Sequence, residues 1–439
     1  MARSRTPYDL WSSQPDHNLE RWFEGCSDPV ENPPELPANP TGYLIVQPDG
    51  GLNQQRIGIV TSVAIAWFLQ ATLVVPRLLF SPVWKDDSKF EDLFDLDHFN
   101  KSLKNLVRIV KEVPREVQKT LRTANVTFIA PKHCSLEWYS AHILPVLKKY
   151  GVAVITEYMH PLGFGMPFHV EQIRCRANYY ALRYNQKLEG IAEQAVQQLR
   201  KDGEKFVAVH VRFQKDMLAD SCCDFGGGPA EREFFKKYRD VNLAIGQYAN
   251  KYKSKPPPEI LRVRGSCPLT PEELGLLLAG MGFSKDTRLY LAGGEVYGGE
   301  SRLAPLRRLF PKMVRVEDVV PRNMLSKLHS HSSRLAVIDT YVCTYSNVFL
   351  TGFSGSNLPA IVLGLRMMYR LGPSILPSKK IAPLLMAAKE GQIRWKEFAA
   401  QVKAIQTPKR ISNSWNVSTF REPAPACVCY RRGLAHISS

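Results

Sequence analysis

The sequence predicts an α/β protein made of two domains, each built around a parallel sheet. The chain has 439 residues, of which 44% are hydrophobic, and at about 100–200 residues per domain this length favours two domains. Two stretches, which begin near residues 43 and 206, alternate short apolar strands with helices. Such a βαβ order produces a parallel sheet. With a polar break at 201–205, we expect an irregular arm at 1–40, domains at 41–202 and 203–380, and C-terminal helices with a tail at 381–439.

The first domain is predicted to begin with a strand at 43–46, a glycine turn, a helix at about 54–70 and a strand at 72–76. The helix is apolar nearly all round, which is typical of a buried helix. The uncharged run 57–75 is long enough to span a bilayer. Gln70 and Thr72 interrupt this run, so we interpret it as a buried helix followed by a strand.

The second domain is predicted to contain strands at 206–211, 287–292 and 348–350, and a helix at 333–345. Another helix should begin at Thr270. There Thr270 and Glu273 form a capping box, and Pro271 occupies the first helical position.

Charge and cysteine content narrow the class of protein. The net charge of +17 comes from 58 Lys and Arg against 41 Asp and Glu. These cations are scattered and do not form the basic, aromatic-rich stripe of a nucleic-acid groove. Nine cysteines and three glycosylation patterns, at Asn100, Asn125 and Asn416, favour a secretory lumen. Residues 1–40 contain no apolar signal segment, so we expect no membrane anchor within this chain.

The first candidate site lies at the end of the 206–211 strand. His210 and Arg212 are two residues apart and so point to the same face. Ligands of open α/β sheets bind at the carboxyl ends of strands, where Arg can neutralise a diphosphate and His can orient a phosphate or sugar. Asp216, in the following loop, is the better candidate for a general base, with Asp220 as the alternative. A structural ion pair between Arg212 and a helix carboxylate explains the pattern equally well.

Two other loops are weaker candidates. Gly50 and Gly51 precede Asn53 and a helix amino terminus, which favours anions, but a tight turn is the more common meaning of such a loop. The loop at 352–357 suits a phosphate or ordinary capping equally well. No Asp-x-Asp pattern ends a strand, so metal-independent chemistry is preferred, and Cys222 and Cys223 are assigned to disulfide or core roles. The candidate residues of the second loop are Ser354, Ser356 and Asn357.

Several long motifs resemble the plant O-fucosyltransferase family, in the same order along the chain. The resemblance extends from about Gly42 to Cys429. The segments that carry it are GYLIVQPDGGLNQQR (42–56), ATLVVPRLLFSPVWKDDSKFEDLFDLDHF (71–99), FVAVHVRFQKDMLADSCC (206–223), GSCPLTPEELGLLLAGMGF (265–283), LYLAGGEVYGGE (289–300) and SSRLAVIDTYVCTYSNVFL (332–350).

The resemblance implies a GT-B-type fold, in which two Rossmann-like domains face a donor-binding cleft. It implies inverting transfer of fucose from GDP-fucose to a hydroxyl of a protein or glycan, without a metal, in the Golgi. Arg212 matches the residue that binds the β-phosphate of the donor, His210 matches the family histidine, and Asn53 matches an asparagine near the sugar and acceptor.

The sequence departs from the family pattern at three places. Gln214 stands where an acidic residue is common, and Asn347, which the family fold places near the guanine, stands where Asp or Glu is common. The segment 364–368 lacks a His and a second Arg. Since Asn offers one acceptor oxygen where a carboxylate offers two, the base and sugar of the donor stay open. The alternatives are a rhamnosyltransferase of the same fold that acts on pectin, and a non-catalytic glycan-binding protein.

Overall fold

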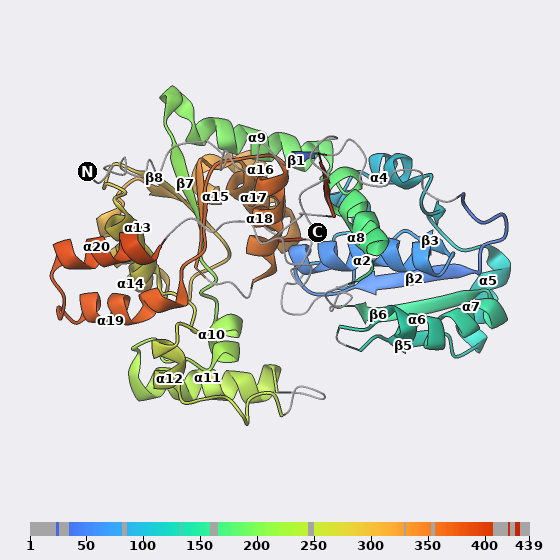
Figure 1. Cartoon of the computed structure of the whole chain (residues 1–439), viewed down its shortest axis with the longest axis horizontal. Coiled ribbons are helices and arrows are strands. Elements are labelled where there is room, and N and C mark those ends of the chain that lie inside the picture. The colour runs from blue at the N-terminus through green and yellow to red at the C-terminus, as the bar shows by residue number, and fades with distance from the viewer. Residues whose placement is uncertain are drawn as a thin grey trace, which may run out of the picture.

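The computed structural model describes residues 23–25, 35–80, 86–131, 133–158, 166–244, 250–328, 331–352, 356–406, 420–421 and 426–430. These residues form two α/β units, each with a parallel five-stranded sheet (Figure 1). The predicted fold class, α/β with two parallel sheets, is therefore confirmed.

The first sheet has the strand order β4-β3-β2-β6-β5. Its centre is β2, where Leu44 lies opposite Leu73 of β3 on one side and Ala153 of β6 on the other. All three side chains are fully buried, because helices cover the sheet. The strands are β2 (Tyr43–Pro48), β3 (Thr72–Val74), β4 (Ile109–Val110), β5 (Thr127–Ile129) and β6 (Val152–Tyr158).

Helix α2 (Leu52–Phe68) connects β2 to β3 and is buried along most of its length. The predicted buried helix and following strand are thereby confirmed. No helix in the described part of the chain is long and apolar enough to cross a membrane. The other helical segments of this unit are α3 (Phe90–Leu93), α4 (Leu96–Leu103), α5 (Arg115–Thr123), α6 (Leu136–His142), α7 (Leu144–Tyr150), α8 (Phe168–Cys175) and a π-helix (Arg176–Ala181).

The second sheet has the order β11-β10-β7-β8-β9, again parallel throughout. Every residue of the central strand β7 is buried, which matches the continuous apolar run of the sequence. The predicted strands near 206, 287 and 348 are confirmed. The strands are β7 (Phe206–His210), β8 (Arg288–Ala292), β9 (Met313–Val314), β10 (Val348–Thr351) and β11 (Ser374–Ile375).

Helices cover both faces of this second sheet. Helix α13 (Pro271–Met281) begins where predicted, since the hydroxyl of Thr270 accepts from the Glu273 amide at 3.2 Å and the Glu273 carboxylate accepts from the Thr270 amide at 2.9 Å. The other helices that follow β7 are α10 (Lys215–Ser221), α11 (Gly228–Asn242), α12 (Pro258–Val263), α14 (Gly299–Leu309), α15 (Val316–Val319), α16 (Arg322–Leu328), α17 (Ser332–Tyr345), α18 (Asn357–Met368), α19 (Ala382–Lys389) and α20 (Trp395–Ile405).

Helix α9 (Gln186–Leu199) precedes the predicted boundary at residue 202 but packs along α17 of the second unit. The Tyr341 hydroxyl donates to Glu193 of α9 at 3.2 Å, and the Arg200 guanidinium donates to the Tyr345 carbonyl at 2.6 Å. Helix α9 thus covers the second sheet, and the exact domain boundary stays a prediction.

A buried arginine closes the carboxyl end of α17. Arg366 of α18 is 1% exposed, and its guanidinium donates to the carbonyls of Cys343, Thr344, Ser346 and Gly372 at 2.7–3.2 Å. A helix leaves its last carbonyls without partners inside the helix. Arg366 therefore joins the carboxyl end of α17 to the segment that leads into β11. Burial lowers the pKa of Arg366 only to about 9.

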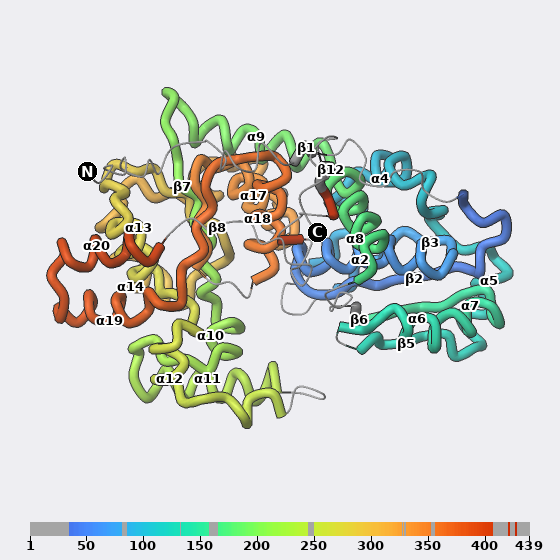
Figure 2. Tube along the Cα trace, in the orientation of Figure 1, coloured from blue at the N-terminus to red at the C-terminus, as the bar shows by residue number. Residues whose placement is uncertain are grey.

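The two ends of the described chain meet beside the first unit. Strand β1 (Phe23–Gly25) pairs antiparallel with β12 (Val428–Tyr430), and the two are labelled close together in Figure 2. A disulfide joins Cys175 of α8 to Cys427. Phe420 and Cys427 are 2% and 0% exposed within the core that also contains α2 and α8. These two residues of the C-terminal segment are therefore part of the core that α2 and α8 share with the second sheet.

Candidate functional site

Three strands of the second sheet end together at the predicted site. His210, the last residue of β7, pairs with Ala292 of β8 and Thr351 of β10. The His210 carbonyl accepts from the Gly352 amide at 2.9 Å, and the Val211 amide donates to the Ala292 carbonyl at 3.0 Å. The chain segments that follow these strands thus lie against one another at one edge of the sheet.

Arg212 is held in place by two side chains that follow it along the chain. One of its terminal nitrogens donates to Oδ2 of Asp216 at 2.5 Å, while the other donates to Oδ1 of Asp216 at 3.3 Å and to Oε1 of Gln214. Asp216 lies in the first turn of α10. The Arg212 side chain is 12% exposed, and that of Asp216 is 20% exposed. The result is a largely buried, oriented guanidinium at the carboxyl end of a central strand.

The imidazole of His210 is neutral in this environment. The residue is 3% exposed, and its Nδ1 has no hydrogen-bond partner among the described residues. Burial, with a smaller contribution from the Arg212 charge, lowers the pKa of His210 to about 3. At neutral pH this side chain can accept or donate a hydrogen bond but carries no charge.

A buried carboxylate that the sequence pattern did not reveal lies at the same edge. Asp339 of α17 is 7% exposed, and it accepts from the Tyr290 hydroxyl at 2.6 Å and from the Gly293 amide at 2.9 Å. Burial raises its pKa to about 6, although both hydrogen bonds oppose that rise. Gly293 has φ of 124°, and a Cβ there would lie 2.8 Å from the Val211 carbonyl oxygen. Asp339 therefore fixes a glycine turn against the Arg212 loop. The one sequence signal for it was a single acidic residue within a buried helix.

The first unit contributes the loop at 50–53. Gly50 has φ of 88°, and Gly51 precedes α2 without a side-chain cap on that helix, so the first-turn amides carry the positive end of the helix dipole. The side-chain amide nitrogen of Asn53 donates to the Thr340 hydroxyl of α17 at 3.2 Å. The side-chain oxygen of Asn53, Oδ1, is buried without a partner among the described residues. Because Thr340 is next to Asp339 in sequence, α17 connects the loops of the two units.

Two predicted donor-binding residues lie near the Gly352 turn. Ser356 precedes α18, and Asn357 is its first residue; both are partly exposed. Ser354 lies outside the described residues.

Asn347 lies at the opposite edge of the sheet, just before β10. Its side-chain Oδ1 accepts from the Phe206 backbone amide at 3.1 Å, and its backbone amide donates to the Phe206 carbonyl at 3.2 Å. Its side chain thus completes the hydrogen bonding at the amino-terminal ends of two strands. This position does not fit the contact with the donor base that we predicted for Asn347, and the geometry gives it a structural role.

Neither predicted base is placed for proton abstraction. Asp216 uses both carboxylate oxygens to bind Arg212. Asp220 accepts from the Lys251 ammonium at 2.5 Å and from the Tyr252 hydroxyl at 2.7 Å. Burial alone would raise the pKa of Asp220, but these partners outweigh burial and lower it. The geometry makes Asp216 a positioning residue for Arg212.

The predicted disulfide or core role of the vicinal cysteines is found for Cys223, which is bonded to Cys267. Within the described residues, no group of three or more His, Cys, Asp or Glu is placed to hold a metal ion. Metal-independent chemistry stays a prediction.

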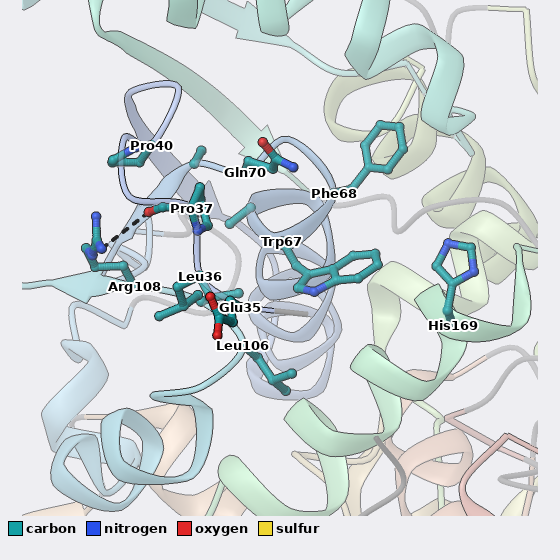
Figure 3. A pocket seen from close by; sticks show the side chains of 13 residues that line it. Glu35, Leu36, Pro37, Pro40, Trp67, Phe68, Gln70, Leu106, Arg108 and His169 are labelled. Atoms are coloured by element: carbon teal, nitrogen blue, oxygen red, sulfur yellow. Dashed lines mark hydrogen bonds between the residues drawn. The ribbon is translucent and has the colours of Figure 1, made fainter. Parts of the chain in front are cut away.

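A separate cavity of about 330 Å³ lies at the amino-terminal edge of the first sheet (Figure 3). Trp67 and His169 form part of its wall, with ring centroids 5.5 Å apart, and the Arg108 guanidinium donates to the Pro37 carbonyl at 3.5 Å. None of the predicted site residues lines this cavity. It faces away from the edge that carries the 50–53 loop, so we do not assign it to the candidate site.

Comparison with known proteins identifies the chain. The family model described as GDP-fucose protein O-fucosyltransferase matches residues 43–369. O-fucosyltransferase 8 of Arabidopsis thaliana is 39% identical over 425 residues, which cover 88% of this chain and 69% of that protein. O-fucosyltransferase 29 of the same plant is 38% identical, over 97% of this chain and 76% of that protein.

Two solved fucosyltransferases are more distant. POFUT1 in complex with GDP-fucose is 16% identical, with a TM-score of 0.43 over 77% of this chain and 99% of that one. The α-1,6-fucosyltransferase NodZ, soaked with GDP-fucose, is 13% identical, with a TM-score of 0.38 over 76% of this chain and 94% of that one.

Two parallel sheets with a fixed cation at the edge of one of them, together with the two Arabidopsis relatives, define the protein as a glycosyltransferase. The chain belongs to the GDP-fucose protein O-fucosyltransferase family.

Proposed function

We propose that the protein transfers fucose from GDP-fucose, with inversion and without a metal, to a hydroxyl of a glycan or protein. The observation that carries the proposal is the oriented guanidinium of Arg212 at the carboxyl end of β7, in a chain of this family. Glycosyl transfer leaves negative charge on the departing diphosphate. A cation whose orientation is fixed before the reaction stabilises that charge without reorganisation.

The composition of the Arg212 loop supports binding of an anion. Asp216 supplies one negative charge, whereas Gln214, which accepts from the same guanidinium, is neutral. Arg212 therefore contacts one carboxylate and one neutral amide, so no second carboxylate at position 214 opposes an incoming diphosphate. The neutral His210 beside them adds a hydrogen-bonding group without adding charge.

The 50–53 loop supports a donor that lies between the two units. The α2 amino terminus favours an anion or an oxygen-rich ligand, and the buried Oδ1 of Asn53 can accept from a sugar hydroxyl. The two disulfides among the described residues support an oxidising lumen such as the Golgi.

Thermal unfolding with GDP, UDP and their sugars tests the proposal. For the wild type, GDP at 100 times its dissociation constant should add about 2.7 kcal/mol of stability, and UDP should add much less. Arg212→Ala should lose this stabilisation, whereas Arg307→Ala, at an exposed ion pair with Glu300, should keep it.

Turnover is measured as GDP released from GDP-fucose, and the anomeric configuration of the product is read by NMR. Loss of one preorganised donor costs about 10²–10³-fold in rate, and we expect this loss for Arg212→Ala. Stabilisation by UDP but not by GDP would contradict GDP-fucose as the donor. The rhamnosyltransferase alternative requires that result. A wild type that responds to no nucleotide would favour the glycan-binding alternative.

A further inference from the structure

An aromatic ladder leads outward from the Arg212 loop. Phe213 follows Arg212 and is fully buried; its ring lies 5.1 Å from that of Phe225, which lies 6.2 Å from Phe235. Phe235 in turn lies 4.8 Å from Tyr297. Each ring therefore supports the next, from the strand end to the surface.

The ladder ends in a partly exposed group of rings, Phe234, Tyr238 and Tyr297, which we call the aromatic platform. Phe234 is 43% exposed and stacks on Tyr297, with centroids 5.8 Å apart and planes inclined by 22°. Tyr238 lies one turn further along α11, 6.4 Å from Phe234. Figure 1 shows α10, α11 and α12 projecting together from the second sheet.

The aromatic platform adjoins the Arg212 loop. The Tyr297 amide donates to the Phe213 carbonyl at 2.8 Å, which places the backbones of Tyr297 and Arg212 on the order of 10 Å apart. The pKa of Tyr238 is raised by burial and then by the negative charge of Asp216, so its hydroxyl also lies within the field of that carboxylate. The aromatic platform therefore lies beside the loop that carries Arg212.

Polar groups border these rings. The Arg302 guanidinium donates to the Glu231 carboxylate at 2.6 Å, with side chains 25% and 8% exposed. The same guanidinium donates to the Phe225 carbonyl at 2.7 Å, so the pair lies beside a residue of the aromatic ladder. Exposed ring faces beside fixed donors and acceptors suit a ligand with an apolar face and a polar rim.

We propose that the aromatic platform binds a saccharide unit of the acceptor; this inference rests on the proposed function. The axial C–H groups of a pyranose ring form an apolar face that packs on the electron-rich face of an aromatic ring, while its hydroxyls reach the Glu231–Arg302 pair.

The test compares Phe234→Ala with Phe168→Ala, a control at a phenylalanine of similar exposure, 41%, on α8 of the first unit. The saccharide probes are cellotetraose, xylotetraose and tetragalacturonate, and the peptide probe is a serine- and threonine-rich 15-mer. Saturation-transfer NMR measures binding without donor, and GDP-dependent thermal stabilisation measures the donor site separately.

We expect at least one saccharide to bind the wild type and the Phe168 variant equally, and to bind Phe234→Ala about ten-fold more weakly. Phe234→Trp should restore binding, and GDP should stabilise all four proteins equally. The assignment is overturned if no saccharide binds below 10 mM, if Phe234→Ala binds like the wild type, or if only the peptide responds. If GDP does not stabilise the wild type, the proposed function is contradicted instead. The two outcomes are distinguishable because saccharide binding is measured without nucleotide.

Discussion

Replacement of His210 by asparagine tests the neutral imidazole at the centre of the site. The pKa of this histidine falls from an ordinary 6.5 to about 3, so between these values the folded state binds fewer protons than the unfolded state. Stability is therefore full above pH 6.5 and decreases as the pH falls through this window. From pH 7 to pH 5 the loss due to this residue is about 2 kcal/mol.

Asp339 acts in the opposite direction. Its pKa is raised from 3.8 to about 6, so the folded state binds more protons and gains about 1 kcal/mol of stability over the same fall in pH. The wild-type profile alone would hide part of the His210 effect. Subtracting the pH profile of His210→Asn from that of the wild type removes the Asp339 contribution, because Asp339 is present in both proteins.

The assay is urea unfolding at pH 5, 6 and 7 with disulfides intact, followed by circular dichroism. Between pH 7 and pH 5 the free energy of unfolding decreases in the wild type by an amount that includes the His210 effect. In His210→Asn this decrease should be smaller by about 2 kcal/mol. His169→Gln, at an exposed histidine, should follow the wild type. Parallel profiles for the wild type and His210→Asn would refute the assignment of a buried, neutral imidazole.

Three further predictions concern stability. Arg366→Met should cost about 4 kcal/mol, because it leaves several buried carbonyls without a donor; a loss below 1 kcal/mol in urea unfolding would contradict this. Joint replacement of Cys175 and Cys427 by serine should cost about 2–5 kcal/mol, seen as a lower unfolding temperature, and an unchanged temperature would show that the cross-link contributes nothing. Thr340→Val should cost about 1–3 kcal/mol, since it removes the acceptor of the buried Asn53 amide; an isoenergetic variant in urea unfolding would mean that water replaces the hydroxyl.

Local pattern predicted most of the scaffold, because strands, buried helices and caps depend on residues close together in sequence. The capping box of Thr270 and Glu273 formed as predicted, and the strands near residues 43 and 206 lie at the centres of the two sheets. The same pattern could not assign α9 to a sheet, since its amphipathic face can pack on either neighbour.

Partners distant in sequence were beyond prediction. The sequence left Arg212 equally suited to a diphosphate and to a helix carboxylate, and the structure shows the carboxylate contact, with Asp216. Asp339 escaped notice because its burial depends on Tyr290 and Gly293, more than 40 residues away. Asn347 was placed by analogy near the base, whereas the register of β10 puts it at the other edge of the sheet.

The pairing of the chain ends sets the order in which the protein can mature. Domains usually fold from the amino terminus while the chain is still being synthesised. Here the core around α2 and α8, which continues into the second sheet, includes Phe420 and Cys427, so the first unit cannot complete its packing on the ribosome before nearly the whole chain has emerged. The Cys223–Cys267 bond closes within the second unit, whereas Cys175 must wait for a partner 252 residues later. The unit that is made first therefore needs the end of the chain to complete its core.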